Sequence, residues 1–586
     1  MTRLTMTMFT KENLIKAALV LLCYTVVVSA VVSLLMINNN YLNPIYFFKS
    51  LLNYEYATFY YKTVLKVAIS APIFLIVLLV ITNKNKKIFE KIYGDAHWAN
   101  AFEIKRQGFF SKTGLIVGNY KGKLLRVKLS SHVLVFAPSR SGKGVSQVIP
   151  NALNWNGSML ITDIKCEVFE HTAGFRQKVG DKVFLFAPSH PEYRTHCYNP
   201  LDLVSRYDRV KRISELQLIT HILIPSVSGD GEMWASEARG LAIGFLVWLA
   251  DTDRPFNIGE LNDVIKGTPD LSAFLQTLLN DSIIGENMID IDTIAYQNLN
   301  NYLQKSEKER SGVRSTLVSH LSLWDDPLIR AATYKSDFNI KNMRRERICI
   351  YLGIPERDMD RLRPLVNLFI QQVGKALSEK IPGKDEPHKV LFLLDEICNL
   401  GPLSTIKKGM SFFAGYGIHI MGIIQNLAQG YEIYGKEGFD SFISNTDYKI
   451  CYYQNDPVGA EFVSKLLGDK TDLTRSKSHK SFFLKQNDGF NDSYIARPLL
   501  SPAEVFKFPR EKAIAIVSSG APIKYDRIIY YTDERFTSRL LPPPVIDAIS
   551  PMFAKVNISQ VSTDSDRELN NLNQINEISN ALEDLI

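Results

Sequence analysis

A short strand followed by a glycine-containing turn constrains this chain more than any other segment. The stretch SHVLVFAPSRSGKGVSQVIPNAL predicts an apolar strand from Val133 to Phe136, a tight loop from Ala137 to Gly142, and Lys143 at the start of a helix. Such a loop directs free backbone N–H groups and a helix N-terminus at phosphate oxygens, and the lysine ammonium reaches the β and γ oxygens. The segment is therefore a Walker A phosphate loop in outline.

Two positions of this loop depart from the generic pattern GxxxxGK[ST]. Ala137 stands in place of the first glycine, and Gly144 in place of the hydroxyl residue that normally ligates Mg²⁺. Taken alone, such a match is also consistent with an ordinary glycine-containing turn, so the context has to decide. The candidate nucleotide-binding residues are Ala137, Pro138, Ser139, Arg140, Ser141, Gly142, Lys143, Gly144 and Val145.

An acidic strand provides that context. In KVLFLLDEICNLG, an apolar run from Val390 to Leu394 is followed by Asp395 and Glu396. We expect Asp395 to hold Mg²⁺ and Glu396 to act as the general base that activates water. The alternative is a buried strand that ends in two solvated acids. Asp163 also ends an apolar strand, but it lacks an adjacent glutamate and is at best a secondary active-site residue.

A third strand, in IHIMGIIQNLAQ, ends at Gln425. At this point a RecA-like core places a polar residue that senses the γ-phosphate, and Gln425 could have this role. An equally good interpretation is that the Gln425 amide only caps the next helix. The chain order of phosphate loop, acidic strand and glutamine-ended strand agrees with the sensor role. The candidate catalytic residues are thus Lys143, Glu396 and Gln425, and the candidate metal ligand is Asp395.

Two apolar stretches precede this core. Residues 17–37 carry no charge and, at about 1.5 Å per residue, are long enough to cross the hydrocarbon layer of a membrane as a helix. Residues 64–82 form a second candidate span, with Lys66 near its start. Basic residues cluster outside both spans, which predicts that both termini lie inside the cell. A cleaved signal peptide is the alternative for the first span.

Length and composition limit the number of domains and the class of protein to which the rest of the chain can belong. With 586 residues the chain is too long for one core, and its 46% hydrophobic and 22% charged content is that of a soluble protein apart from the anchor. The net charge of +7 permits contact with nucleic acid or anionic lipid without requiring it. The six cysteines are scattered without a CxxC pair, which indicates a reducing compartment and no structural zinc.

The distance along the chain between Lys143 and Asp395 predicts an insertion. Residues 203–336 are rich in helical patterns, so we assign them to an inserted all-α domain. Strand patterns return from Arg347 and continue to the segments KAIAIVSS and IKYDRIIYY. The predicted domains are a membrane anchor (1–88), a first part of the nucleotide-binding domain (89–202), the insert (203–336), a second part (337–548) and a C-terminal tail (549–586).

Two further segments allow more than one interpretation. Residues 475–493 mix basic and aromatic side chains without periodicity, which predicts a solvated mobile loop or a loop that touches DNA. The acidic, asparagine-rich tail carries apolar residues at steps of three and four, which suit docking on an adaptor or a frayed terminal helix.

Several motifs together resemble the TraG-like (TraG/TraD) coupling proteins of bacterial type IV secretion systems over roughly residues 90–535. They are APSRSGKGVSQVIPNAL, TDIKCEVFEHTAGFR, HCYNPLD, MWASEARGL, ERSGVRSTL, YLGIPERDMDRLRPLVNLFIQQV, FLLDEICNLGPL, GYGIHIMGIIQNLAQGYEIYG and RPLLSPAEV. The GKG ending of the phosphate loop is usual in that family, so Gly144 no longer argues against ATP binding. It leaves the Mg²⁺ ligands incompletely assigned.

The resemblance implies a RecA-like P-loop ATPase with a mostly parallel α/β sheet, an inserted all-α domain and a two-helix anchor in the inner membrane. It also implies ATP and Mg²⁺ as cofactors, a hexameric ring, and delivery of DNA–protein (relaxase–DNA) or effector-protein substrates to channel components. Ring motors of this kind use an arginine finger from the neighbouring subunit. No arginine lies between Asp395 and Gln425, so that role stays unassigned.

One other function remains open from the sequence, and a second is disfavoured. The chain is alternatively a substrate receptor or docking platform that binds nucleotide with little hydrolysis. Gly144 is consistent with this alternative, because it replaces the hydroxyl residue that normally ligates Mg²⁺. A chromosome-pumping translocase of the same superfamily is disfavoured by the short anchor, the insert and the family motifs.

Overall fold

The computed structural model describes residues 92–227, 229, 231–284, 291–478, 489–518 and 520–554. These residues fall into two compact units, of which one holds residues 92–95 with 469–497 and the other holds the remainder. Both predicted membrane spans lie outside the described residues, as does the tail after residue 554. Within the described part of the chain, no helix combines the length and the apolar character that crossing a membrane requires.

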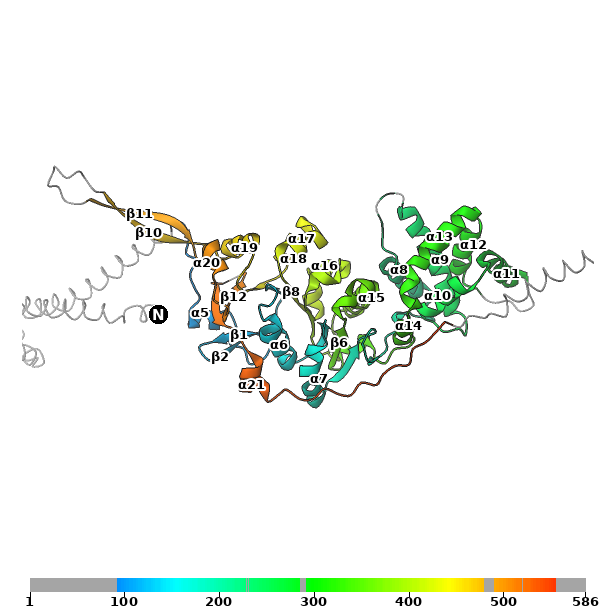
Figure 1. Cartoon of the computed structure of the whole chain (residues 1–586), viewed down its shortest axis with the longest axis horizontal. Coiled ribbons are helices and arrows are strands. Elements are labelled where there is room, and N and C mark those ends of the chain that lie inside the picture. Colours follow the sequence, from blue (N-terminus) through cyan, green and yellow to red (C-terminus); the bar gives the residue numbers. More distant parts are fainter. Residues whose placement is uncertain are drawn as a thin grey trace, which may run out of the picture. The chain divides into compact units, whose positions relative to one another are not determined.

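One sheet of eleven strands forms the centre of the larger unit, with the order β2-β1-β13-β12-β9-β3-β8-β7-β4-β6-β5 (Figure 1). From β9 to β5 all neighbours are parallel, and β12, β13, β1 and β2 extend the sheet with antiparallel pairs. The fold is therefore α/β with a mostly parallel sheet, as predicted. The strands are β1 (Leu115–Tyr120), β2 (Lys123–Val127), β3 (Val133–Phe136), β4 (Ser158–Asp163), β5 (Lys182–Phe186), β6 (Ile348–Gly353), β7 (Val390–Leu394), β8 (Ile418–Ile424), β9 (Tyr448–Cys451), β12 (Lys512–Val517) and β13 (Ile523–Asp526).

Helices cover both faces of this sheet, and the central strands are buried on both sides. Alternate residues of β3 pack into two separate hydrophobic cores: Leu134 and Phe136 share one core with α15 (Met359–Ser378), and Val133 and Val135 share the other with α6 (Ile149–Asn154) and α7 (Glu167–Lys178). Continuous apolar runs such as those of β3 and β7 are what a strand buried on both faces requires.

The predicted insert is a group of helices between β5 and β6, placed to one side of the sheet (Figure 1). Buried Arg212 links three of its segments, because its guanidinium lies 2.6 Å from Asp251 Oδ1 and 2.9 Å from Asp292 Oδ2. Its helices are α8 (Arg209–Leu223), α9 (Gly231–Ala250), α10 (Ile258–Gly267), α11 (Leu271–Ile284), α12 (Thr293–Leu303), α13 (Glu307–Leu321) and α14 (Pro327–Ala332).

The remaining short helices border the strands of the sheet or follow them along the chain. They are α5 (Ala101–Arg106), α16 (Ser404–Gly409), α17 (Leu427–Tyr434), α18 (Lys436–Ser444), α19 (Pro457–Leu467), α20 (Pro502–Phe506) and α21 (Glu534–Thr537).

The smaller unit contains a feature that the sequence did not predict. The segment expected to be an aperiodic loop includes the ends of β10 (Asp469–Ser478) and β11 (Gly489–Pro498), which pair as a two-stranded sheet. None of the side chains that the structure describes in these strands, at residues 469–474 and 493–498, is buried, so no buried face imposes an alternating pattern on that part of the sequence. The absence of periodicity is therefore a poor guide to strands whose described side chains are not buried.

The beginning of the predicted tail also differs from a free terminus. The Ile549 amide donates to the Tyr193 carbonyl, and the Met552 amide donates to the Pro327 carbonyl of α14. Residues 549–554 therefore run along the α/β core and reach the insert.

Candidate nucleotide site

The phosphate loop connects β3 to a helix as predicted, with one difference in the first turn. Arg140 and Gly142 have positive φ values of 56° and 76°, which close the loop tightly before Lys143. The helix begins with a π-helical segment, η2 (Gly144–Val148), and becomes α-helical only at α6. Pro150 lies at the junction of the two segments and has no N–H to donate to the Ser146 carbonyl, so one bond of the regular i to i−4 pattern is absent there.

Three strands bring the predicted site residues together. β8 lies between β3 and β7 and is parallel to both, with Phe136 opposite Ile424 and Leu394 opposite Gly422. The carboxyl ends of parallel strands meet at one edge of a sheet, which is where ligands bind in open α/β folds. The phosphate loop, Gln425 and the acidic pair are consequently neighbours despite their separation in the sequence.

Lys143 and the two acids are in direct contact. Its Nζ atom lies 2.9 Å from Asp395 Oδ1 and 2.6 Å from Glu396 Oε1. All three side chains are mostly buried, with 14%, 23% and 19% of their surfaces exposed. Burial raises the pKa of the Asp395 carboxyl, and the nearby Lys143 ammonium partly offsets this effect.

Glu396 is held by a set of hydrogen bonds at a strained backbone position. The Gln425 Nε2 atom donates to Glu396 Oε1 at 2.6 Å, and the Asn399 Nδ2 atom donates to Oε2 at 2.6 Å. The backbone of Glu396, with φ of 56° and ψ of 54°, lies in the left-handed region, which is unusual for a residue other than glycine. Such strain is typically maintained at functional sites, where the surrounding contacts enforce it.

Two residues of this arrangement, Asn399 and Thr162, were not among those predicted from the sequence. Asn399 contacts Glu396 as just described; it lies three residues after Glu396 in the motif FLLDEICNLGPL, where it was given no role. The Asp395 amide donates to Thr162 Oγ1 at 2.7 Å, and this bond joins the ends of β7 and β4. Thr162 is the first residue of the motif TDIKCEVFEHTAGFR, in which only Asp163 was given a candidate role.

Asp163 lies at the end of β4 with its carboxylate turned to the backbone. Its Oδ2 atom accepts a hydrogen bond of 2.8 Å from the Phe169 amide of α7. Burial raises the pKa of Asp163 to about 7, and the negative charges of Glu167 and Asp395 add to this effect. The structure therefore gives Asp163 a structural contact next to the site.

This shift predicts how stability depends on pH. Because the pKa rises from 3.8 to about 7 on folding, the folded state binds the proton more tightly, and stability falls as the pH rises through this window. The slope is about 1.4 kcal/mol per pH unit. We expect Asp163→Asn, which keeps an acceptor for the Phe169 amide, to remove about 2–3 kcal/mol of this loss between pH 5 and pH 7.

Urea unfolding of both full-length proteins at the two pH values measures that difference. Asp360→Asn, at an exposed carboxylate, is the control and should leave the slope unchanged. Equal slopes for wild type and Asp163→Asn would contradict the assignment.

The residues of the site fit a magnesium nucleotide. The Ser141 hydroxyl is buried and has no hydrogen-bond partner among the described residues, so it is available to a ligand. A side chain at position 144 would meet nothing within 4 Å, so packing does not explain the absence of a hydroxyl there. Mg²⁺ commonly takes one or two carboxylates together with phosphates and water, and Asp395 can supply the carboxylate.

Comparison with known proteins extends over most of the chain. The family model described as "Type IV secretory system Conjugative DNA transfer" matches residues 97–550. The chain belongs to this family. Members with similar sequences include Protein VirD4 of Agrobacterium fabrum (strain C58 / ATCC 33970), 30% identical over 514 residues that cover 83% of this chain and 74% of VirD4. The conjugal transfer protein TraG of Escherichia coli is 29% identical over 536 residues, which cover 80% of this chain and 81% of TraG.

Solved structures of the plasmid coupling protein TrwB share the fold. The unbound form of TrwBdeltaN70 superposes with a TM-score of 0.54 at 18% identity, over 79% of this chain and 98% of that chain. TrwB in complex with ADP and Mg²⁺ superposes with a TM-score of 0.54 at 15% identity, over 79% and 99% of the two chains. These likenesses establish the α/β architecture of the family member described here.

Proposed function

We propose that this chain is a membrane-anchored coupling ATPase of a bacterial type IV secretion system, which binds Mg·ATP and uses its hydrolysis to deliver substrates to the secretion channel. The observation that carries the proposal is the contact of Lys143 with Asp395 and Glu396 at the carboxyl ends of β3 and β7. Family membership supports it, as do the structures of TrwB in complex with ADP and Mg²⁺ and with a non-hydrolysable ATP analogue.

Each site residue has a distinct part in this proposal. The loop amides and Lys143 bind the β- and γ-phosphates, and Asp395 carries Mg²⁺, which would neutralise charge on the phosphates. Glu396 accepts a proton from the attacking water. Gln425, which donates to Glu396 at 2.6 Å, is placed to couple the state of the γ-phosphate to the orientation of that base.

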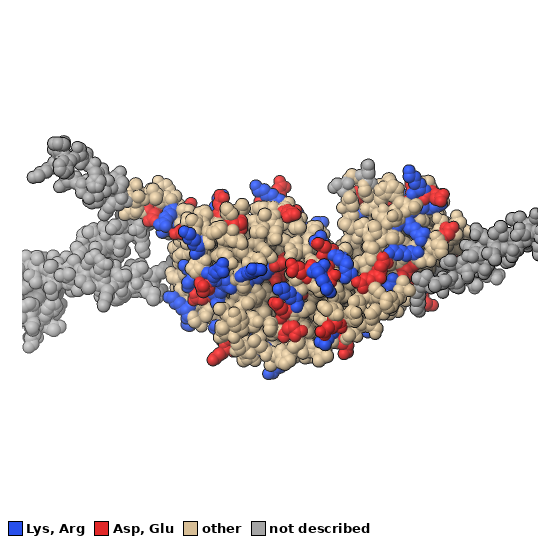
Figure 2. All heavy atoms as spheres, in the orientation of Figure 1, with Lys and Arg blue, Asp and Glu red and all other residues tan. Residues whose placement is uncertain are grey.

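The proposal includes an anchor and an assembly. Residues 17–37 and 64–82 would span the inner membrane and leave the ATPase domain in the cytoplasm, and several copies would form a hexameric ring. Channel components of the inner membrane, relaxase–DNA complexes or protein effectors, and an adaptor at the C-terminal tail are the proposed partners. The face seen in Figure 2 mixes basic and acidic side chains, so the net positive charge is not gathered into one patch there.

Phosphate release by the full-length chain, in detergent or lipid nanodiscs, tests this function. We expect Mg-dependent ATP hydrolysis whose specific rate rises with protein concentration as subunits assemble. Light scattering, measured in parallel, gives the mass of the assembly at each concentration. Tight ATP binding without turnover, even with DNA and an assembled ring, would contradict the motor and favour a docking platform that uses nucleotide only structurally.

A further inference from the structure

A guanidinium group from a distant strand lies on the phosphate loop. Arg527 directly follows β13, and a Cβ atom at Gly142 would lie only 2.5 Å from Arg527 Nη2. The guanidinium therefore fills the space beside the glycine that precedes Lys143. No motif of the sequence indicated this contact, because 385 residues separate the two positions (527 − 142).

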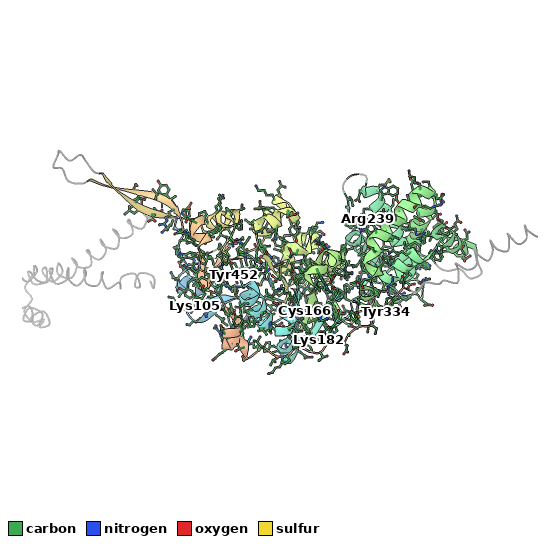
Figure 3. All side chains as sticks on the ribbon, viewed as in Figure 1. Lys105, Cys166, Lys182, Arg239, Tyr334 and Tyr452 are labelled. Carbon is green, nitrogen blue, oxygen red and sulfur yellow. The ribbon has the colours of Figure 1, made fainter. Side chains whose placement is uncertain are left out.

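Arg527 is fixed in this position by three contacts. Its guanidinium carbon lies 4.6 Å from the centre of the Tyr452 ring, its Nη1 atom donates to the Arg510 carbonyl at 2.6 Å, and its amide donates to the Glu511 carbonyl at 2.8 Å. Tyr452 follows β9 (Figure 3) and its hydroxyl is hydrogen-bonded to the Ser146 hydroxyl on η2. The cation is thus held rigidly relative to the loop, which favours binding by preorganisation.

The charge of Arg527 is not balanced by an acid. Among the described residues, no carboxylate lies within ion-pair distance of it, and its Nε atom is buried without a hydrogen-bond partner. Buried arginines elsewhere in this unit do have acidic partners: Arg212 pairs with Asp251, and Arg344 pairs with Glu386. A half-buried guanidinium beside an anion-binding loop is therefore available to an anion.

The sheet order indicates which part of the anion it meets. β8 and β7, which carry Gln425 and the acidic pair, lie on one side of β3, whereas β9, β12 and β13 lie on the other. A nucleotide with its γ-phosphate at Glu396 would extend its other phosphates toward the β9 side.

We propose that Arg527 is a phosphate-binding residue for the α- and β-phosphates that ATP and ADP share. The proposal rests on nucleotide binding by the phosphate loop, as proposed above. It separates the site into two flanks: Lys143, Glu396 and Gln425 act on the γ-phosphate and water, and Arg527 binds without taking part in the chemical step. Loss of such an interaction raises KM and leaves kcat nearly unchanged.

Arg527→Gln in the full-length chain tests this role. We expect the dissociation constants of ADP and of a non-hydrolysable ATP analogue to rise equally, by about 10-fold, and kcat at saturating ATP to stay within about 3-fold. Arg527→Lys, which keeps the charge but not the planar fork, should give an intermediate loss of about 3-fold. If Arg527→Gln does not fold, the nucleotide affinity of Arg527→Lys tests the proposal in its place.

Arg539→Gln is a matched control. Arg539 also stacks on an aromatic ring, at 5.3 Å from the centre of Phe175, and also donates to a carbonyl, that of Leu153. This control should leave both affinities within about 2-fold, because these contacts lie at α6 and α7 and do not involve the phosphate loop.

Two outcomes would overturn the proposal: a loss of affinity confined to the ATP analogue, or unchanged affinities in Arg527→Gln, with or without a loss of thermal stability. Unchanged affinities with a loss of thermal stability are what a purely structural stacking role predicts. If wild type itself does not bind ADP, the proposed ATPase function fails, which is a separate result.

Discussion

Replacing Glu396 with glutamine is expected to lower ATP turnover by at least about 10²-fold, the size of effect typical for loss of a general base. Affinity for Mg·ATP should stay within about 3-fold. Glutamine has the same shape and keeps an oxygen that can accept from Asn399 or Gln425, but it cannot take a proton from water. Lys143 retains Asp395 as a partner at 2.9 Å, so the variant should fold.

Phosphate release and equilibrium nucleotide binding by the same preparation measure the two effects. Glu432→Gln provides a control, since this exposed glutamate on α17 lies beyond Gln425 in the same segment. Turnover at the wild-type rate in the Glu396 variant would remove Glu396 from the mechanism.

Replacing Lys143 with alanine is expected to weaken Mg·ATP binding by roughly 30- to 150-fold, because hydrogen bonds to charged groups contribute about 2–3 kcal/mol. The same change leaves Asp395 and Glu396 adjacent and mostly buried without their cation. Burial already raises the pKa of Asp395 against the opposing effect of Lys143, so the loss of the ammonium should raise this pKa further.

Calorimetric titration of nucleotide measures the loss of affinity. Lys165→Ala is the control, because Lys165 is an exposed lysine just beyond β4 at the same edge of the sheet. Equal affinities of wild type and Lys143→Ala would show that the loop does not hold the phosphates.

The sequence was most informative where one residue type at one position has a chemical meaning. The apolar strands before Lys143, Asp395 and Gln425 were predicted because buried parallel strands need continuous apolar runs. The convergence of these three residues then followed from the rule that parallel strands end at one edge. The order of the strands, with β8 between β3 and β7, could not be obtained from local patterns.

Contacts between distant segments account for what the sequence did not reveal. Thr162, Tyr452 and Arg527 reach the site from the ends of β4, β9 and β13. Thr162 lies in TDIKCEVFEHTAGFR and Arg527 in IKYDRIIYY, but neither pattern gives these two residues a role. The pairing of β10 with β11 was missed because the side chains that the structure describes in these strands are not buried, and alternation marks a strand only when one face is buried. The π-helical turn after Lys143 has no local sequence signature, although Pro150 at its end marks an interruption of the helix hydrogen bonds.

The structure of the full-length chain with Mg²⁺ and a non-hydrolysable ATP analogue, determined by electron cryo-microscopy, tests the central claim most directly. We predict that Lys143 Nζ lies within about 3 Å of β- and γ-phosphate oxygens, that the metal is carried by Asp395, and that Glu396 faces the γ-phosphate. A nucleotide bound elsewhere, or phosphates out of reach of Lys143 and both acids, would contradict the account.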